Sequence, residues 1–158
     1  MPVSAVENNK EHEIEFIIIY SKLSNESIEK LRTVQNCKLR LLQVDEDIFT
    51  SLPLSHWVTV QAWFRIKLPD MCNDLDKILY LDCDTLILGD LSELFNTNLE
   101  GKYLAGVKDV WGVNKYCARL NMTSGVYVNS GMLLFNAEYC RRENFFDKIV
   151  DFANNNKL

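Results

Sequence analysis

The stretch KILYLDCDTL, residues 77–86, decides what the rest of the chain is compared with. Its first part is apolar apart from the lysine, which predicts a buried β-strand over 77–82. Asp82 and Asp84 follow where that strand ends. Residues two apart on an extended chain project to the same side, so both carboxylates are expected to face one ion together.

Two carboxylates at the end of a buried strand are costly unless a positive partner accompanies them. A hard divalent cation, Mg²⁺ or Mn²⁺, is the natural partner, and it usually completes its shell with water and phosphate oxygens. The plain alternative is a turn in which both aspartates are only solvated. The position directly after KILYLD favours the metal site at Asp82 and Asp84.

Outward from this stretch, strand patterns alternate with helix patterns, which predicts one α/β domain over 1–158 with a mostly parallel sheet. Ser24 is expected to cap one helix, and Asn136 to cap a long helix that reaches residue 152. A helix from Trp57 should end at Leu68, because Pro69 follows it. Strands are predicted over 13–20, 38–44, 77–82, 103–108 and 131–136. Ligands of such sheets bind beyond the carboxyl ends of the strands.

Composition narrows the function classes. The chain has 158 residues, a net charge of −5 and a pI near 5.1, which argues against wholesale binding of nucleic acid or anionic membrane. No apolar run reaches the ~18 residues that a membrane span needs, and the N-terminus lacks a signal-peptide pattern. Five scattered cysteines without a paired spacing indicate buried thiols in a reducing compartment. We therefore expect a cytoplasmic protein.

Two enzyme classes place an Asp-x-Asp pair after such a strand. In a haloacid-dehalogenase-like phosphatase, the pattern Asp82-x-Asp84-Thr85 would supply a nucleophile, a general acid and a Mg²⁺ site. In a nucleotide-sugar glycosyltransferase, the two aspartates hold a metal on the diphosphate of the donor. The local motif alone leaves both alternatives open.

Three longer segments resemble glycosyltransferase family 8, the metal-dependent retaining hexosyltransferases that include lipopolysaccharide galactosyltransferases and glycogenin. They are FRIKLPD (64–70), DKILYLDCDTLILGDLSELF (76–95) and YVNSGMLLFN (127–136). All occur in the family's order and at similar spacing. A dehalogenase-like protein has no reason to carry the first and the last of them. The resemblance implies a Rossmann-like nucleotide-sugar transferase domain of the GT-A type.

The resemblance also implies roles for single residues. Asp82 and Asp84 would chelate Mn²⁺ or Mg²⁺ on a UDP-sugar, and the backbone at Cys83 would touch the ribose. Arg65 would reach the donor sugar and diphosphate. Asn129, Ser130 and Gly131, at the start of the last strand, would make further donor contacts. Asp109, after the strand 103–108, is a weaker candidate for such a contact. Trp111 is a candidate for stacking on the acceptor. No residue is assigned as a catalytic nucleophile.

The resemblance begins and ends inside the family's domain, so we expect an incomplete domain. The family's first strand precedes the matched part, and a histidine that is its third protein metal ligand follows it. A sheet without its first strand has an open edge, which favours self-association.

The expected reaction transfers glucose or galactose from a UDP-sugar to a saccharide acceptor with retention, as in lipopolysaccharide biosynthesis. The alternatives are the phosphatase and a fragment that retains the core of the fold without catalysis.

Overall fold

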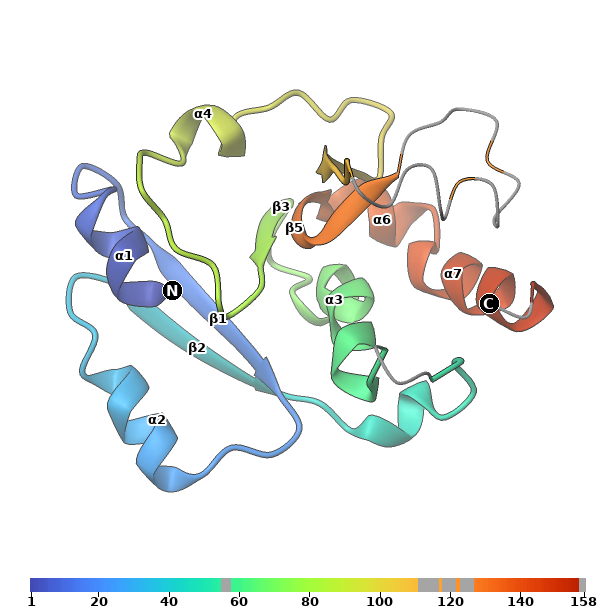
Figure 1. The fold of residues 1–158 in the computed structure, drawn as a ribbon, viewed down its shortest axis with the longest axis horizontal. Helices are drawn as coiled ribbons and strands as arrows, with labels where there is room; N and C mark the ends of the chain where they lie inside the picture. The colour runs from blue at the N-terminus through green and yellow to red at the C-terminus, as the bar shows by residue number, and fades with distance from the viewer. Residues whose placement is uncertain (55–57, 111–116, 118–121, 123–126, 157–158) are drawn as a thin grey trace.

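The computed structural model describes residues 1–54, 58–110, 117, 122 and 127–156, and they form an α/β fold (Figure 1). The strands are β1 (Glu15–Tyr20), β2 (Lys38–Gln43), β3 (Lys77–Leu81), β4 (Leu104–Lys108) and β5 (Val128–Asn136). The helices are α1 (Pro2–Glu7), α2 (Asn25–Arg32), α3 (Val60–Met71), α4 (Ser92–Phe95), α6 (Ala137–Arg142) and α7 (Phe145–Asn155), with a 3₁₀ turn over Glu46–Phe49.

β1 and β2 form a parallel pair in which Glu15 lies opposite Lys38 and Tyr20 opposite Gln43. The apolar run of β1 is rich in isoleucine, whose branched side chain suits a strand packed on a core. Helix α2 connects the two strands and begins after Ser24, whose side chain accepts a hydrogen bond from the Ser27 amide at 3.2 Å. The predicted N-cap of α2 is therefore confirmed.

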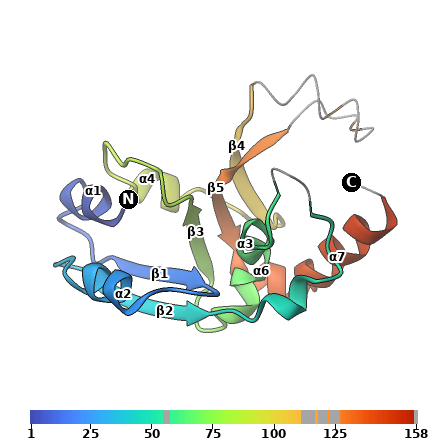
Figure 2. The same ribbon diagram turned by 60° about the horizontal axis from the view of Figure 1, so that its bottom comes forward.

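The other sheet has the order β3-β5-β4, and β5 runs antiparallel to both neighbours. The prediction of a mostly parallel sheet holds for β1 and β2 and is wrong for this sheet. Lys108, the last residue of β4, pairs with Val128, the first residue of β5. Because the chain re-enters the sheet at the end where β4 leaves it, β5 must run back in the opposite direction. Figure 2 shows the three strands rising steeply from the β1–β2 pair.

Helices α3, α6 and α7 pack together on the three-stranded sheet (Figure 2). Their shared core contains Leu68 of α3, Ile78 of β3 and Phe135 of β5, all buried. Ile17 and Ile19 of β1 pack against the same core. The two sheets are thus joined by one apolar interior even though no strand of one is paired with a strand of the other in the described residues.

The proline of α3 does not end the helix, contrary to the prediction. Pro69 lies inside α3, which continues to Met71. The Arg141 guanidinium of α6 donates to the carbonyl oxygens of Pro69 at 2.8 Å and of Cys72 at 3.1 Å. A cation on the last carbonyls stabilises a helix C-terminus, so contacts from a distant helix outweigh the local effect of the proline. The predicted start at Trp57 lies outside the described residues.

The long helix predicted after Asn136 is two helices. Asn136 caps α6 as expected, since its side chain accepts from the Tyr139 amide at 3.1 Å. The helix is interrupted at Asn144, which has a left-handed backbone with φ of 53°. Asparagine is one of the few residues that tolerate this conformation, and the break lets α7 turn onto α3.

An arginine side chain clamps the β1–β2 pair to the turn before β3. Arg40 of β2 donates to Glu15 of β1 at 3.0 and 3.2 Å and to both oxygens of Asp74 at 2.8 Å. Hydrogen bonds from Arg40 hold the pKa of Asp74 below its usual value. This bidentate geometry fixes the β1–β2 pair relative to the entrance of β3.

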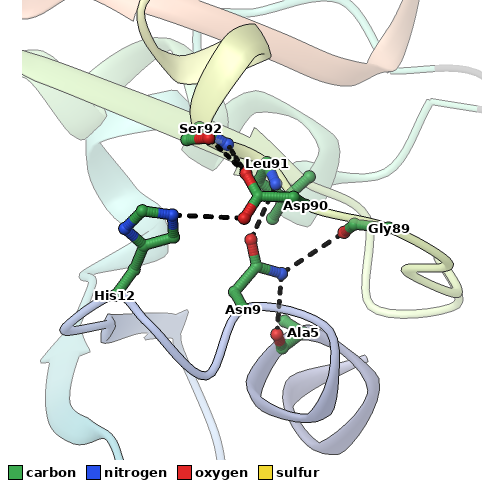
Figure 3. A network of polar contacts seen from close by, with 7 residues as sticks. All are labelled: Ala5, Asn9, His12, Gly89, Asp90, Leu91 and Ser92. Carbon is green, nitrogen blue, oxygen red and sulfur yellow. Dashed lines mark hydrogen bonds and ion pairs between the residues drawn. The ribbon is translucent and has the colours of Figure 1, made fainter.

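A buried asparagine ties the N-terminal helix to the segment that follows the Asp-x-Asp stretch (Figure 3). Asn9 is 4% exposed. Its amide donates to the Ala5 and Gly89 carbonyls at 2.8 and 3.4 Å, and its oxygen accepts from the Leu91 amide at 2.7 Å. Beside it, His12 lies 3.1 Å from Asp90. Asn9 therefore satisfies the backbone groups of a segment that has no regular secondary structure.

The structure bears on two further predictions, the absence of a membrane span and self-association through an open sheet edge. Among the described residues, no helix is long and apolar enough to cross a bilayer. In the same residues β1, β2, β3 and β4 each pair with a neighbour along one edge only, and self-association through an open edge stays a prediction.

Replacing Asn9 should destabilise the protein, because the Leu91 amide and the Gly89 carbonyl would lose a buried partner. We expect Asn9→Ala to lower the free energy of unfolding by about 1–3 kcal/mol, measured by urea denaturation. Asn25→Ala, at an exposed asparagine of α2, is the matched control and should change it by less than about 0.5 kcal/mol. Equal effects of the two changes would contradict the role assigned to Asn9.

Candidate functional site

The antiparallel β5 brings three segments to one end of the three-stranded sheet. Its first residues meet the carboxyl ends of β3 and β4, because antiparallel strands pair start to end. The Asp82 amide, just after β3, donates to the Gly131 carbonyl at 2.8 Å. The Asp109 amide, just after β4, donates to the Tyr127 carbonyl at 2.8 Å. Asp82, Asp109 and residues 129–131 are all predicted site positions, and they therefore lie at the same end of the three-stranded sheet.

The carboxylate of Asp82 is held by two side chains of the protein. Oδ1 accepts a hydrogen bond from the Tyr80 hydroxyl at 2.7 Å and lies 3.5 Å from Nη1 of Arg65. Tyr80 lies on β3 and Asp82 directly follows the end of that strand, and both side chains contact Arg65 of α3. The Asp82 side chain remains 40% exposed, which leaves it accessible to a ligand.

Arg65 projects from α3 onto this carboxylate and is only 13% exposed. Its Nε donates to the Ala62 carbonyl at 2.8 Å, and its Nη1 donates to the Ser130 carbonyl. The guanidinium carbon lies 4.8 Å from the centre of the Tyr80 ring. Arg65 therefore links the helix, β3 and the start of β5, and its charge offsets that of Asp82.

Tyr80 is protonated in this arrangement. Burial, together with the hydrogen bond to Asp82, raises the pKa of its hydroxyl above the usual value. A protonated phenol is a donor, so it pairs naturally with the acceptor-only carboxylate. Tyr80 is not among the predicted site residues, although its position two residues before Asp82 is a readable signal.

Gly131 makes room for Asp82. A Cβ atom at position 131 would lie 2.6 Å from Oδ2 of Asp82 and 3.0 Å from Oδ1 of Asn129. The predicted role of Gly131 is to allow close approach of a donor, and in the structure the group that lies close to it is the Asp82 carboxylate.

Asn129 and Ser130 contribute to the site through a side-chain oxygen and a backbone carbonyl, respectively, which the sequence alone does not specify. Oδ1 of Asn129 accepts from the Gly131 amide at 2.7 Å, which shapes the strand entry and leaves the amide nitrogen out of that bond. Ser130 contacts Arg65 through its backbone carbonyl. Both residues are exposed.

Asp84 does not follow Asp82 on an extended chain, so the geometric reason given for their pairing is wrong. β3 ends at Leu81, and the Thr85 amide donates to the Asp82 carbonyl at 3.1 Å, closing a turn over 82–85. Cys83 and Asp84 are exposed in this turn. Asp82 and Asp84 therefore lie two residues apart in one turn at the end of β3.

The remaining predicted positions differ in what the structure describes. Asp109 is half-buried at the end of β4. Trp111, the candidate for acceptor stacking, lies outside the described residues. Within the described residues, no group of three or more histidine, cysteine or acidic side chains is arranged to hold a metal ion. Asp82 and Asp84 are two carboxylates, so a metal ion bound to them would need further ligands to complete its shell.

Comparisons with known proteins agree on one family. The family model described as glycosyl transferase family 8 matches residues 2–158. General stress protein A of Bacillus subtilis is 28% identical over 98% of this chain and 56% of its own length. Lipopolysaccharide 1,2-glucosyltransferase of Escherichia coli is 33% identical over 94% of this chain and 47% of its own length. The chain thus spans about half the length of the curated relatives it matches.

A solved structure shares the fold described above. The galactosyltransferase LgtC, in complex with donor and acceptor sugar analogues, superposes with a TM-score of 0.79. It is 25% identical to this chain, and the match covers 95% of this chain and 59% of LgtC. The predicted Rossmann-like, GT-A type domain is confirmed.

A side chain at position 131 should displace the Asp82 carboxylate. We expect Gly131→Ala to break the Tyr80–Asp82 hydrogen bond and to lower the free energy of unfolding by about 1–3 kcal/mol, measured by denaturation and by a structure of the variant. Gly89→Ala is the control, since nothing lies within 4 Å of a Cβ atom there. An Asp82 side chain that stays in place in Gly131→Ala would refute the steric argument.

Proposed function

The chain belongs to glycosyl transferase family 8. We propose from this that the end of the sheet formed by Arg65, Asp82 and residues 129–131 binds the diphosphate of a UDP-sugar through a divalent metal ion. The full protein would then transfer a hexose, glucose or galactose, from that donor to a saccharide acceptor. This chain would supply the central part of the donor site.

The observation that carries the proposal is the meeting of opposite charges and hydrogen-bonding groups at one end of the sheet. Arg65, Asp82 and residues 129–131 come from three different elements and are joined by the bonds described above. A nucleotide-sugar donor has a doubly charged diphosphate beside a polar sugar, so it needs a cationic contact, a metal site and amide groups. A solvated turn would need no such convergence.

The acidic residues suit Mn²⁺ or Mg²⁺. Both ions prefer oxygen ligands and keep several waters or phosphate oxygens in their shell. Asp82 and the exposed Asp84 offer hard carboxylate oxygens at one corner, while the described residues provide no complete cage. This donor set fits an ion that is shared between the protein and a diphosphate. A bound ion of this kind would act as a Lewis acid that stabilises the departing diphosphate.

The chain's own residues would bind and orient the donor. Arg65 is mostly covered but still 13% exposed, and its guanidinium is positively charged, so it can contact the diphosphate without a large change of position. Asn129 would donate its amide hydrogens to the hexose, and Ser130 and Asp109 would line the same edge. The backbone at Cys83 would contact the ribose. No residue is assigned as a nucleophile.

The finer substrate assignments also belong to the proposal. Retention of the anomeric configuration and UDP as the nucleotide are properties of the family that the segments of this chain resemble. Two relatives act on glucose and galactose by name, and one is a lipopolysaccharide transferase. These names support a hexose donor and a saccharide acceptor for the longer protein.

Calorimetric titration of UDP, UDP-glucose and UDP-galactose into the 158-residue chain tests the donor site. With Mn²⁺ present we expect saturable binding that EDTA removes. In Asp82→Asn/Asp84→Asn the dissociation constant should rise at least about tenfold, because the metal loses its carboxylates. Asp151→Asn changes an exposed aspartate of α7 and should bind as the wild type does.

Two other results would each reject the proposal. Absence of UDP binding by a demonstrably folded chain would indicate a core without a donor site. Metal-dependent release of phosphate from a simple phosphoester, abolished by Asp82→Asn, would favour the phosphatase that the pattern Asp82-x-Asp84-Thr85 also allows.

A further inference from the structure

We propose that Tyr80 is a positioning residue of this site: its hydroxyl fixes the Asp82 carboxylate and its ring holds Arg65, so that these two opposite charges do not close into a bidentate pair. The inference rests on the proposed function in so far as Asp82 receives a metal. The positioning itself is a property of the ligand-free protein.

The orientation of the Asp82 carboxylate is fixed at both of its oxygens. The Tyr80 hydroxyl donates to Oδ1 at 2.7 Å, and Oδ2 lies against position 131, where only a glycine leaves room for it. A carboxylate with one oxygen bonded and the other beside a close backbone has little freedom to rotate. Among the described residues, no hydrogen bond to Oδ2 is formed, so Oδ2 is the oxygen that is available to a cation.

The position of Arg65 is fixed by the Tyr80 ring and by two carbonyl oxygens. Its guanidinium lies over the Tyr80 ring, 4.8 Å from the ring centre, and is also bonded to the carbonyls of Ala62 and Ser130. Contacts with an aromatic face and with carbonyl oxygens satisfy the cation without using up the carboxylate. The Tyr80 side chain is thus in contact with both charges at once.

Arg65 and Asp82 do not form a bidentate ion pair in this structure. An arginine and a carboxylate left to themselves form a bidentate pair with two parallel hydrogen bonds of about 2.7–2.9 Å. Here the approach is through a single oxygen at 3.5 Å. A bidentate pair would occupy both oxygens of Asp82 and compete with a metal ion. By occupying Oδ1 and supporting the guanidinium, Tyr80 keeps this closure from happening.

The test compares Tyr80→Phe with the wild type. Phenylalanine keeps the ring under Arg65 and removes only the hydroxyl. Tyr103→Phe is the matched control, since the Tyr103 hydroxyl bonds to Lys148 at 3.0 Å, away from the site. Three quantities are measured: the Asp82 χ1 distribution in the metal-free protein by NMR couplings, the dissociation constant of UDP at fixed Mn²⁺, and the melting temperature.

In Tyr80→Phe we expect Asp82 to average over rotamers and the dissociation constant of UDP to rise about 10- to 100-fold, as for other residues that orient metal ligands. Tyr103→Phe should match the wild type in both measurements. A Tyr80→Phe protein that keeps the wild-type rotamer, or that loses it without weaker binding, overturns the inference. A binding loss that only follows a lower melting temperature in both variants also overturns it.

Failure of the proposed function gives a different pattern. If the wild type does not bind UDP with Mn²⁺ while the Asp82 rotamer is lost in Tyr80→Phe, the metal–donor assignment is wrong and the positioning role of Tyr80 is supported.

Discussion

The pairing of β3 with β5 is the constraint on which the site depends. Register places Leu81 opposite Met132, and the next hydrogen bond joins the Asp82 amide to the Gly131 carbonyl. A shift by one residue would turn every side chain of β3 to the other face. Tyr80 and Asp82 would then leave α3, and Arg65 would lose its two side-chain contacts. The apolar face of β3 that packs on Leu68 and Cys72 therefore also sets the direction of the polar residues at its end.

The site combines a mostly covered cation with a more exposed anion, and this difference in burial has a physical basis. Arg65 can be nearly covered because carbonyl oxygens of Ala62 and Ser130 replace its water, which reduces the cost of burying a charge. Asp82 keeps contact with solvent and so remains able to exchange partners. A diphosphate and its metal would meet one preformed positive group and one adjustable negative group, an arrangement that suits a ligand carrying both signs of charge.

Local signals in the sequence predicted local features well. The caps at Ser24 and Asn136 and the strand KILYL needed only neighbouring residues. Two errors, the turn over 82–85 and the helix break at Asn144, concern local backbone. Two others arose where distant residues decide. Pro69 stays helical because Arg141 supports the last turn, and the direction of β5 depends on its pairing with two strands. Asp82 and Asp84 were located by the local pattern and the other site residues by resemblance. Their contacts, such as the Tyr80 hydroxyl on Asp82 and the backbone carbonyl of Ser130 on Arg65, follow from the packing of α3 against the sheet.

The contact of Arg141 with the end of α3 also bears on how the protein can be divided. Helix α3 carries Arg65, and its last carbonyls at Pro69 and Cys72 are satisfied by a residue about seventy positions later. A shortened gene product that stopped before α6 would retain the whole Asp-x-Asp segment and yet expose those carbonyls. In a chimera or a minimal expression fragment, the boundary therefore belongs after Arg142, because the helix that carries Arg65 is anchored from that side of the chain.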